Sequence, residues 1–487
     1  MAGGKRADVY PTIDLGNGMV GWDGPDDPAN PRNFSLSQKR FLMFLVSSVT
    51  FISPFASSVF SPGVVYVEEE FHVTSKILGT LSVTGYLIGY VTGPLFFSPL
   101  SEMFGRRIVL SAANTFFVAF QIGCALAPTI SALIVFRFLT GVGGSACLTT
   151  GGGVVADLFI AEQRGLAMTL YTTGILIGPV LGPLLGGFVA QRAGWHWVFW
   201  VLVIAGGVLS ALVMVFNRET NHVVLMRWKT DRLRKELNRP ELYSCYERSR
   251  TGGKAKRLSY KSTLGKRLIM PFYLLVRSPI VFPVATYLAT LYGCLYLLFT
   301  TVTDVFKNTY GWSTEISGLA YLGLGVGFVA GQIVFALASD RIINRLKQRN
   351  NDEYEPEMRL STTIFFALFV PVSFFWYGWS AQQKTHWIVP IIGLAPFAFG
   401  MVGIYNTLQT YVIDCYPRYA ASATAAMVIT RSLMGALLPL AGPRMYAALG
   451  YGWGNSLLGF VTLGMIPVPL LFYRYGGRVR RSFELDL

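Results

Sequence analysis

The chain has 487 residues, and 52% of them are hydrophobic whereas only 14% are charged. An ordinary soluble domain carries roughly a quarter charged residues, so this composition argues against a globular protein that folds in water. The formal net charge of +15 does not predict a nucleic-acid partner, because membrane topology and contact with anionic lipid head groups account for it better.

Apolar stretches of about 20 residues, the length of a helix that crosses a bilayer core, recur along the chain with the charged residues between them. We therefore predict an all-α polytopic membrane protein with twelve transmembrane helices, here called spans 1 to 12. The predicted spans are 41–62, 76–98, 108–127, 130–155, 165–190, 196–216, 279–303, 315–338, 360–379, 386–410, 419–440 and 453–473.

A basic loop divides the spans into two groups of six. The predicted organisation is a cytoplasmic N-terminal segment (1–40), an N-terminal six-helix bundle (41–216), a basic cytoplasmic central loop (217–278), a C-terminal six-helix bundle (279–473) and a cytoplasmic tail (474–487). Lys and Arg are retained on the cytoplasmic side of short loops. Because they gather in the termini and the central loop, we expect both termini to be cytoplasmic.

Two rows of glycines indicate that the halves are internal repeats. Glycines spaced by four lie on one face of a helix and let a neighbouring backbone approach closely. The rows, at the same spacing and at a constant offset, are Gly85, Gly89 and Gly93 in span 2 and Gly323, Gly327 and Gly331 in span 8.

Each glycine row leads into a short charged loop. A carboxylate there can pair with arginines and helix termini in one conformation and release them in another, which makes the loop a candidate gate latch. The alternative is a loop charge that is only solvated. The candidate gate residues are Gly93 near the end of span 2, Glu102, Gly105, Arg106 and Arg107 after that span, and Asp340 and Arg341 after span 8.

Two arginines lie inside predicted spans, Arg137 in span 4 and Arg431 in span 11. Ionisable groups within a membrane are costly, so each must face a wet cavity or find partners. A part in substrate or proton handling and a structural clamp onto backbone carbonyls are equally open. Asp157, at the end of span 4, is a further candidate for proton coupling.

Span 5 combines glycines at intervals of four with two prolines. Proline bends a helix and glycine allows tight packing, so we predict a kinked, closely packed helix at the interface of the two halves. We find nothing similar in span 11, its expected counterpart. The residues of this pattern are Gly174, Gly178, Pro179, Gly182, Pro183, Gly186 and Gly187.

Polar and aromatic side chains at mid-span positions would suit a cavity that binds a partly apolar solute through ring faces and a few hydrogen bonds. For any one of them, a polar group satisfied between helices is the alternative. The cavity candidates are Tyr86, Tyr90, Tyr171, Tyr292, Tyr296, Asn406 and Gln409.

These motifs resemble the major facilitator superfamily and, within it, the fungal twelve-spanner drug:proton antiporters. The segment 93–107 is similar to the superfamily's loop motif, with Glu102 where many relatives have aspartate. Residues 137–141 are similar to the motif associated with proton coupling, and 178–187 to the antiporter motif. Smaller signatures agree, among them Arg218-Glu219-Thr220 after span 6.

The resemblance implies two six-helix bundles that rock around a central cavity, with proton entry driving solute exit. We expect a monomeric multi-pass protein of the plasma membrane that binds a small-molecule substrate and uses the proton gradient, with no cofactor or metal. Two buried arginines without a mid-span acid favour a neutral or anionic solute over a polycation.

We rank export of a small amphipathic compound, a drug or secondary metabolite, first and export of an organic (di)carboxylic acid second. A membrane sensor that binds a solute without transporting it is the alternative of another class. An enzyme is not expected, since the sequence has no glycine-rich phosphate loop after a strand and no paired histidines or cysteines at metal-binding spacing.

Overall fold

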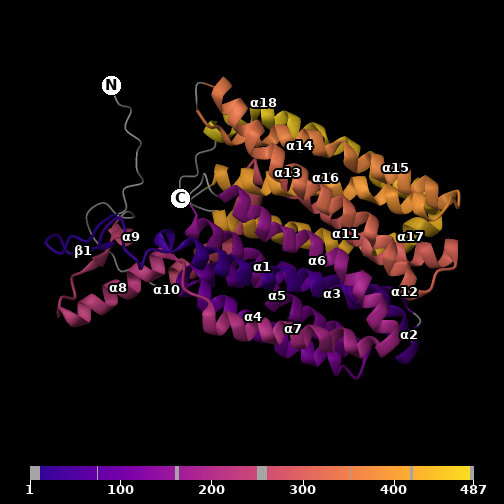
Figure 1. The fold of residues 1–487 in the computed structure, drawn as a ribbon, viewed down its shortest axis with the longest axis horizontal. Coiled ribbons are helices and arrows are strands. Elements are labelled where there is room, and N and C mark those ends of the chain that lie inside the picture. Colours follow the sequence, from indigo (N-terminus) through magenta and orange to yellow (C-terminus); the bar gives the residue numbers. More distant parts are fainter. Residues whose placement is uncertain are drawn as a thin grey trace.

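The structure is a computed structural model that describes residues 11–73, 75–159, 164–248, 260–350, 353–416 and 420–482. Long helices run side by side along one axis, with the N-terminal half, indigo to magenta, next to the C-terminal half, orange to yellow (Figure 1). Helices satisfy their own backbone hydrogen bonds, which is the condition for crossing a bilayer.

The N-terminal half contains six long helices. They are α1 (Leu36–Ser58), α3 (Lys76–Phe104), α4 (Arg106–Ala125), α5 (Ile130–Leu158), α6 (Arg164–Ala193) and α7 (Trp195–Phe216), with the short α2 (Val64–Glu70) after α1. Ser35 starts α1 through a capping box, in which its side chain accepts from the backbone of Gln38 and the Gln38 side chain returns the bond.

The C-terminal half repeats this arrangement with more interruptions. It comprises α11 (Val281–Tyr310), α12 (Thr314–Ser317), η4 (Gly318–Tyr321), α13 (Leu322–Arg349), η5 (Pro356–Arg359), α14 (Leu360–Ala367), α15 (Phe369–Gln382), α16 (Ile388–Cys415), α17 (Ala420–Met465) and α18 (Pro467–Ser482). Together α14 and α15 form the predicted span 9.

The long α17 provides two membrane crossings. Its backbone leaves helical geometry at Gly450 (φ 72°, ψ 177°), and Tyr446 Oη donates to Asn455 Oδ1 at 3.1 Å. Residues that far apart on a straight helix would be separated by more than 10 Å along the axis, so the chain turns back here. Within the described residues, eleven helical segments are long and apolar enough to cross a membrane. Because the last of these segments turns back at Gly450 and crosses twice, the eleven segments correspond to the twelve predicted spans.

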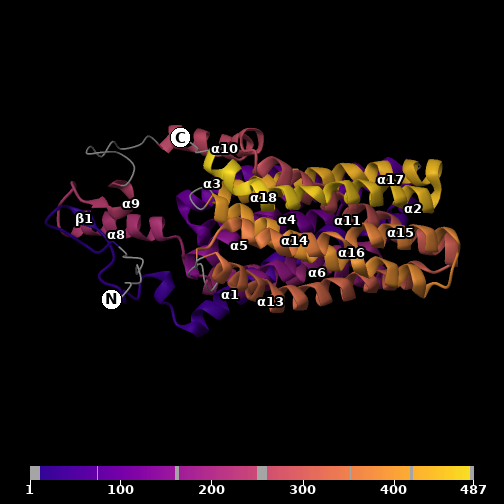
Figure 2. The same cartoon turned by 90° about the horizontal axis from the view of Figure 1, so that it is seen from above.

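A small folded unit lies beyond one end of the bundle, which we call the loop end (Figures 1 and 2). It contains α8 (His222–Glu236), α9 (Cys245–Arg248) and the parallel pair of β1 (Met19–Val20) and β2 (Tyr243–Ser244). Trp22 is fully buried there. The helix α10 (Tyr260–Arg277) also lies near this end (Figure 2). None of these elements was predicted from the sequence, because each lies in a polar segment.

Both glycine rows pack as their spacing predicts. The row of α3 faces α5, where a Cβ added to Gly93 would lie 2.7 Å from the carbonyl oxygen of Val142. The row of α13 faces α16, where a Cβ on Gly331 would lie 3.0 Å from the carbonyl oxygen of Phe399. In the α3–α5 pair and in the α13–α16 pair the two helices therefore approach each other closely in the same way, as expected for two halves that are internal repeats.

The glycine row of span 5 has a different neighbour from the one expected. A Cβ on Gly174 would lie 3.1 Å from the Ser47 carbonyl oxygen and one on Gly178 would lie 2.8 Å from that of Phe51, so the row packs against α1 within its own half. Gly182 and Gly186 also face α1. A different face of α6, which includes Gly187, packs against the C-terminal half.

Span 11 does contain a related pattern, which corrects our expectation. Pro439 and Pro443 lie inside α17, four residues apart as Pro179 and Pro183 are in α6. A Cβ on Gly442 would lie 3.4 Å from Thr301 Cγ2 of α11, so this helix packs against α11 as α6 packs against α1. The pattern was missed because the predicted span ended at 440.

Candidate functional site

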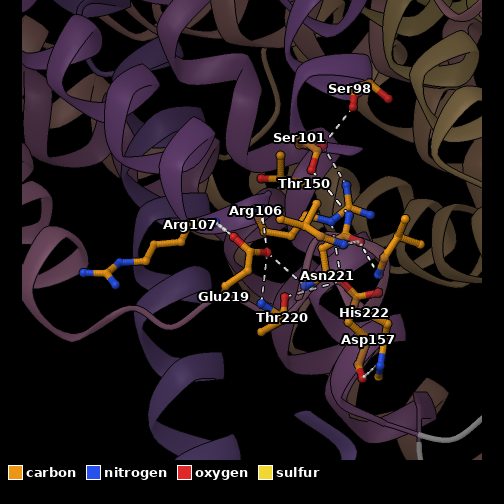
Figure 3. Close-up of polar contacts among 12 residues, drawn as sticks. Ser98, Ser101, Arg106, Arg107, Thr150, Asp157, Glu219, Thr220, Asn221 and His222 are labelled. Atoms are coloured by element: carbon orange, nitrogen blue, oxygen red, sulfur yellow. Dashed lines mark hydrogen bonds and ion pairs between the residues drawn. The ribbon is translucent and has the colours of Figure 1, made fainter. Parts of the chain in front are cut away.

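A carboxylate is buried between two helix ends at the loop end of the N-terminal half (Figure 3). Glu219, which follows α7 and is 7% exposed, accepts from the backbone N–H groups of Arg106 (2.9 Å) and Arg107 (3.1 Å) at the start of α4. It also accepts from the N–H groups of Thr220 and Asn221. Unpaired N–H groups and the positive end of the helix dipole stabilise an anion here. Glu219 therefore fixes the start of α4 to the end of α7.

The Arg106 side chain connects this cap to the end of α5. Its Nη1 donates to Ser101 Oγ at 2.6 Å and its Nε to Asp157 Oδ2 at 3.4 Å. His222 Nε2 donates to the backbone carbonyl of Asp157 at 2.9 Å, and its ring packs edge-on against Trp22. Five residues, called the loop-end cluster, thus come together: Ser101, Arg106, Asp157, Glu219 and His222 (Figure 3).

His222 is neutral in this arrangement. Burial lowers the pKa of the imidazole below its usual 6.5, and the nearby charge of Asp157 acts in the opposite direction. In the described ranges its Nδ1 has no hydrogen-bond partner, so a second ring proton would be buried there without an acceptor.

Gly105 makes room for the cluster between α3 and α4. Its φ of 102° lies in the region that favours glycine, and a Cβ at this position would collide with the carboxylate of Glu219. A glycine is therefore required at position 105 of the loop motif, because a side chain there would overlap the carboxylate of Glu219.

The structure places the remaining gate candidates as follows. Arg107 points outward and its Nη2 donates to the Met214 carbonyl at 3.2 Å. Glu102 is partly buried in the last turn of α3, and Arg341 is exposed on α13. The side chain of Asp340 lies outside the described part of the chain.

The C-terminal half has a related pair at the same end. Arg359 donates through Nε to Asp414 Oδ2 at 2.7 Å, joining the start of α14 to the end of α16, as Arg106 joins α4 to Asp157 on α5. Tyr354 Oη also donates to Asp414, at 2.6 Å. The sequence analysis did not select Arg359 or Tyr354.

A carboxylate also lies at the start of the ninth span, but its partner differs from that of Glu219. Glu357, 4% exposed, accepts from Nε of Arg480 on α18 at 3.0 Å. A carboxylate is therefore bound by a side-chain cation here, whereas Glu219 is bound by backbone N–H groups.

Arg137 is completely buried, and each of its three side-chain nitrogens donates to a backbone carbonyl. Nη1 and Nη2 donate to Ala56 (2.7 Å) and Ser57 (2.9 Å) of α1. Nε and Nη2 donate to Ser82 (3.2 Å) and Val83 (3.4 Å) of α3. In this structure Arg137 clamps α5 to α1 and α3, which is the structural alternative considered above. Its part in substrate or proton handling stays a prediction.

Two predicted cavity tyrosines lie beside this clamp. Tyr86 and Tyr90 are fully buried, and their hydroxyls bond to Ser53 Oγ at 3.0 and 2.6 Å. The Tyr86 ring lies 4.8 Å from the guanidinium carbon of Arg137, close enough for a cation–π contact.

Tyr296 links the two halves near their centre. Its hydroxyl bonds to Ser57 Oγ of α1 at 2.5 Å, and its ring lies 5.0 Å from that of Tyr292 on the same helix. Tyr171 of α6 is also buried, and donates to the carbonyls of Cys147 and Leu148, both at 3.0 Å.

Arg431 is as buried as Arg137, at 1% exposed, but is bound differently. Its Nη1 donates to Tyr405 Oη at 2.7 Å, and the rings of Tyr292 and Tyr405 lie 4.8 and 5.2 Å from its guanidinium carbon. Its Nε and Nη2 have no hydrogen-bond partner among the described residues. Tyr405 was missed by the sequence analysis, because a tyrosine in a span rich in aromatic residues carries no distinguishing signal.

An amide network crosses between the halves. Asn406 Nδ2 donates to Gln332 Oε1 at 2.9 Å, and Gln332 Nε2 donates to Thr173 Oγ1 of α6 at 3.0 Å. Asn406 thus belongs to a polar bridge, the alternative given for such residues. Gln409, one turn further, is 4% exposed.

The halves also meet at the end opposite the loop end. Arg192 Nη2 of α6 and Glu315 Oε1 of α12 form an ion pair at 2.5 Å. Nearby, a Cβ on Gly187 would lie 3.1 Å from the Thr314 carbonyl oxygen and 3.7 Å from Glu315 Cα. This contact joins the two halves by a salt bridge and by closely packed backbone.

A small cavity of about 10 Å³, with room for about one water molecule, lies within the N-terminal half between α1, α4 and α7. It reaches Ser53, which also holds Tyr86 and Tyr90. The lining residues are Val49, Ile52, Ser53, Asn114, Phe117, Gly206 and Leu209.

Comparison with known proteins supports the same fold and class. A family model of the Major Facilitator Superfamily matches residues 46–439. The chain is similar to the MFS transporter cpaT of Aspergillus oryzae, with 45% identity over 463 residues that cover 95% of this chain and 92% of that protein. It is also similar to the MFS-type transporter penM of Penicillium rubens, with 46% identity over 464 residues that cover 95% and 90%.

Solved structures agree on the fold. The proton:xylose symporter XylE bound to 6-bromo-6-deoxy-D-glucose matches with a TM-score of 0.68 at 18% identity, over 91% of this chain and 96% of that one. XylE in a partially occluded inward open conformation matches with a TM-score of 0.66 at 16% identity, over 90% and 98%. The predicted resemblance is confirmed: this chain is a multi-pass membrane protein that belongs to the major facilitator superfamily, a family of small-molecule transporters and not of enzymes.

Proposed function

We propose that the protein is a proton-coupled secondary transporter that exports a small amphipathic organic compound, a drug or a secondary metabolite, by alternating access. The similarity to fungal proteins named as MFS transporters supports a transporter. The gathering of basic residues in the loop-end segments supports a cytoplasmic loop end, and we propose the plasma membrane as the location from the family resemblance.

The observation that carries this proposal is the contact between the halves at the end opposite the loop end. Arg192, whose side chain is 72% exposed, pairs there with Glu315. An ion pair with such an exposed partner is weak because water screens it, so it can break and re-form in each cycle. The glycine contacts beside this ion pair can separate without leaving large side chains that lack packing partners.

For the proton, we favour Asp157. Among the described residues, its carboxylate accepts long bonds from Arg106 Nε and from Thr220 Oγ1, both 3.4 Å. Protonation would weaken the Arg106 contact and loosen the joint between α4 and α5. The variant Asp157→Asn imitates the protonated carboxyl, so we expect it to export without responding to the proton gradient. Unchanged gradient dependence would contradict this assignment.

Alternating access can be tested by a reversible cross-link. The double variant Gly187→Cys/Glu315→Cys places two thiols where a Gly187 Cβ lies 3.7 Å from Glu315 Cα, close enough for a disulfide. We expect oxidation to stop export and a reductant to restore it. Each single variant is the control, and the native Cys124, Cys147 and Cys294 are buried. Full export by the oxidised protein would contradict the mechanism.

The substrate class is tested by accumulation of labelled compounds in cells with and without the protein. An azole, a polyamine and a dicarboxylate are compared at two external pH values, with a protonophore as control. Lower retention that depends on the proton gradient supports proton-coupled export. Binding to the purified protein without any flux would instead favour a sensor.

A further inference from the structure

The free donors of Arg431 indicate that an anion is missing from its surroundings. The guanidinium is 1% exposed, and Nε and Nη2 lack acceptors among the described residues. No ion pair among those residues involves Arg431. The Tyr405 hydroxyl and the two aromatic rings are neutral, and cation–π contacts recover only part of the cost of burying a charge.

The two free donors lie on one edge of the guanidinium plane. Nε–H and the nearer Nη2–H point in the same direction and match the two oxygens of a planar anion. Nη1, on the other side, is already bound to Tyr405. The Tyr292 hydroxyl also lacks a hydrogen-bond partner within the described part of the chain, although its ring faces the same guanidinium. Tyr292 can therefore supply a third donor.

This position lies between the two halves. One turn beyond Arg431, a Cβ on Gly435 would lie 3.3 Å from Leu87 Cδ1 of α3 and 3.1 Å from Tyr292 Cδ1 of α11. An occupant would thus be enclosed by aromatic and aliphatic groups of both halves, at the place that alternating access opens to each side in turn.

We propose that Arg431 and Tyr292 bind the anionic group of the transported compound, and that this compound is an amphipathic organic acid with a carboxylate or a similarly acidic enolate on an apolar body. This inference rests on the proposed function and narrows its substrate class. Tyr405 acts as a positioning residue, since it holds Nη1 and so orients the free edge.

The test compares a probe acid with its neutral amide. Binding of 1-naphthylacetate and 1-naphthylacetamide, which share the ring and differ in charge, is measured on the purified full chain by thermal shift and titration. We expect the acid to bind and the amide to bind at least about tenfold more weakly. Arg431→Gln should lose about tenfold or more in affinity for the acid, and Tyr292→Phe a few-fold. Arg444→Gln, an exposed site on the same helix, is the matched control.

Three results would overturn the subsite: equal binding of acid and amide, undiminished acid binding by a folded Arg431→Gln, or no stabilisation of the wild type by 1-naphthylacetate, octanoate or benzoate at millimolar concentration. Flux in proteoliposomes separates this inference from the proposed function. Acid binding through Arg431 without gradient-driven flux contradicts export and leaves the subsite intact. Gradient-driven flux of neutral compounds alone supports export and contradicts the subsite.

Discussion

The two halves hold their buried charges in different ways. In the N-terminal half, Arg137 donates to four backbone carbonyls and Glu219 accepts from four backbone N–H groups. In the C-terminal half, Arg431 bonds to a tyrosine hydroxyl and Glu357 to an arginine side chain. The helices pair in the same pattern. The buried span arginine and the capping glutamate have backbone partners in the N-terminal half and side-chain partners in the C-terminal half, whereas Arg106 and Arg359 bind a carboxylate side chain in both halves.

This difference bears on which half can rearrange. A charge bonded to several helix backbones can move only if those helices move with it. A charge bonded to side chains can change partners by rotamer changes, while the backbone stays in place. We therefore expect the N-terminal half to be the more rigid body, and the C-terminal half to hold the groups that respond to a solute.

The largest effect is expected from Arg137→Met. Methionine keeps much of the volume but cannot donate to the carbonyls that join α5 to α1 and α3, so the free energy of unfolding should fall by about 3 kcal/mol. Thermal unfolding of the purified variant in detergent measures this, with Arg444→Gln as the control. A loss below about 1 kcal/mol would show that the backbone clamp is weak.

The next effect separates Glu219→Gln from Glu357→Gln. The amide lacks the charge that stabilises the α4 N-terminus and accepts fewer bonds, so Glu219→Gln should destabilise by about 1.5 kcal/mol. Glu357→Gln loses a pair with the 30% exposed Arg480 side chain and should cost about 0.5 kcal/mol. Hydrogen exchange at the start of α4 should rise only in the first variant. Equal losses in both would remove the contrast.

A change of opposite sign is expected for Arg431→Met. This variant removes two buried donors without acceptors and loses one bond to Tyr405, so the free energy of unfolding should rise by about 1 kcal/mol while acid binding is lost. Thermal unfolding of the purified variant in detergent measures this change in the free energy of unfolding. A destabilisation like that of Arg137→Met would mean that the two arginines are equivalent.

The smallest effect concerns pH. Because burial lowers the pKa of His222 below 6.5, the unfolded chain binds its proton first as pH falls. The contribution of His222 is therefore fully present above about pH 6.5 and is lost as the pH drops through the folded-state pKa. Between pH 7.5 and 5.5, wild type should lose up to about 1 kcal/mol more than His222→Gln. Identical pH profiles would show that His222 does not titrate on folding.

The sequence predicted the membrane helices well, because crossing a bilayer requires apolar stretches of a defined length. Gly89 and Gly327 could be assigned to helix contacts from spacing alone, since steric room depends on the residue itself. The loop-end unit was missed because α8 and the β1–β2 pair are held by contacts between segments more than 200 residues apart, which no local pattern shows.

The two arginines show the limit of prediction at the site. Both were identified from the sequence as buried cations. They differ in whether backbone carbonyls surround the side chain, and the sequence does not show this because every residue carries a carbonyl. Glu219 was noted only within a signature, because its partners are N–H groups at a helix start that folding brings to it. Tyr405 carried no signal because its span is rich in aromatic residues and its partner is the side chain of Arg431 on another helix.

The β1–β2 pair has a consequence for the order of biosynthesis. Met19 and Val20 emerge from the ribosome early, whereas their partners Tyr243 and Ser244 follow only after the six helices of the N-terminal half. Contacts between segments so distant in sequence form late. Until then Trp22 lacks the partners that bury it, so this tryptophan becomes enclosed only when the first half of the chain has been synthesised. A nascent protein that stalls earlier leaves the Trp22 ring accessible to chaperones.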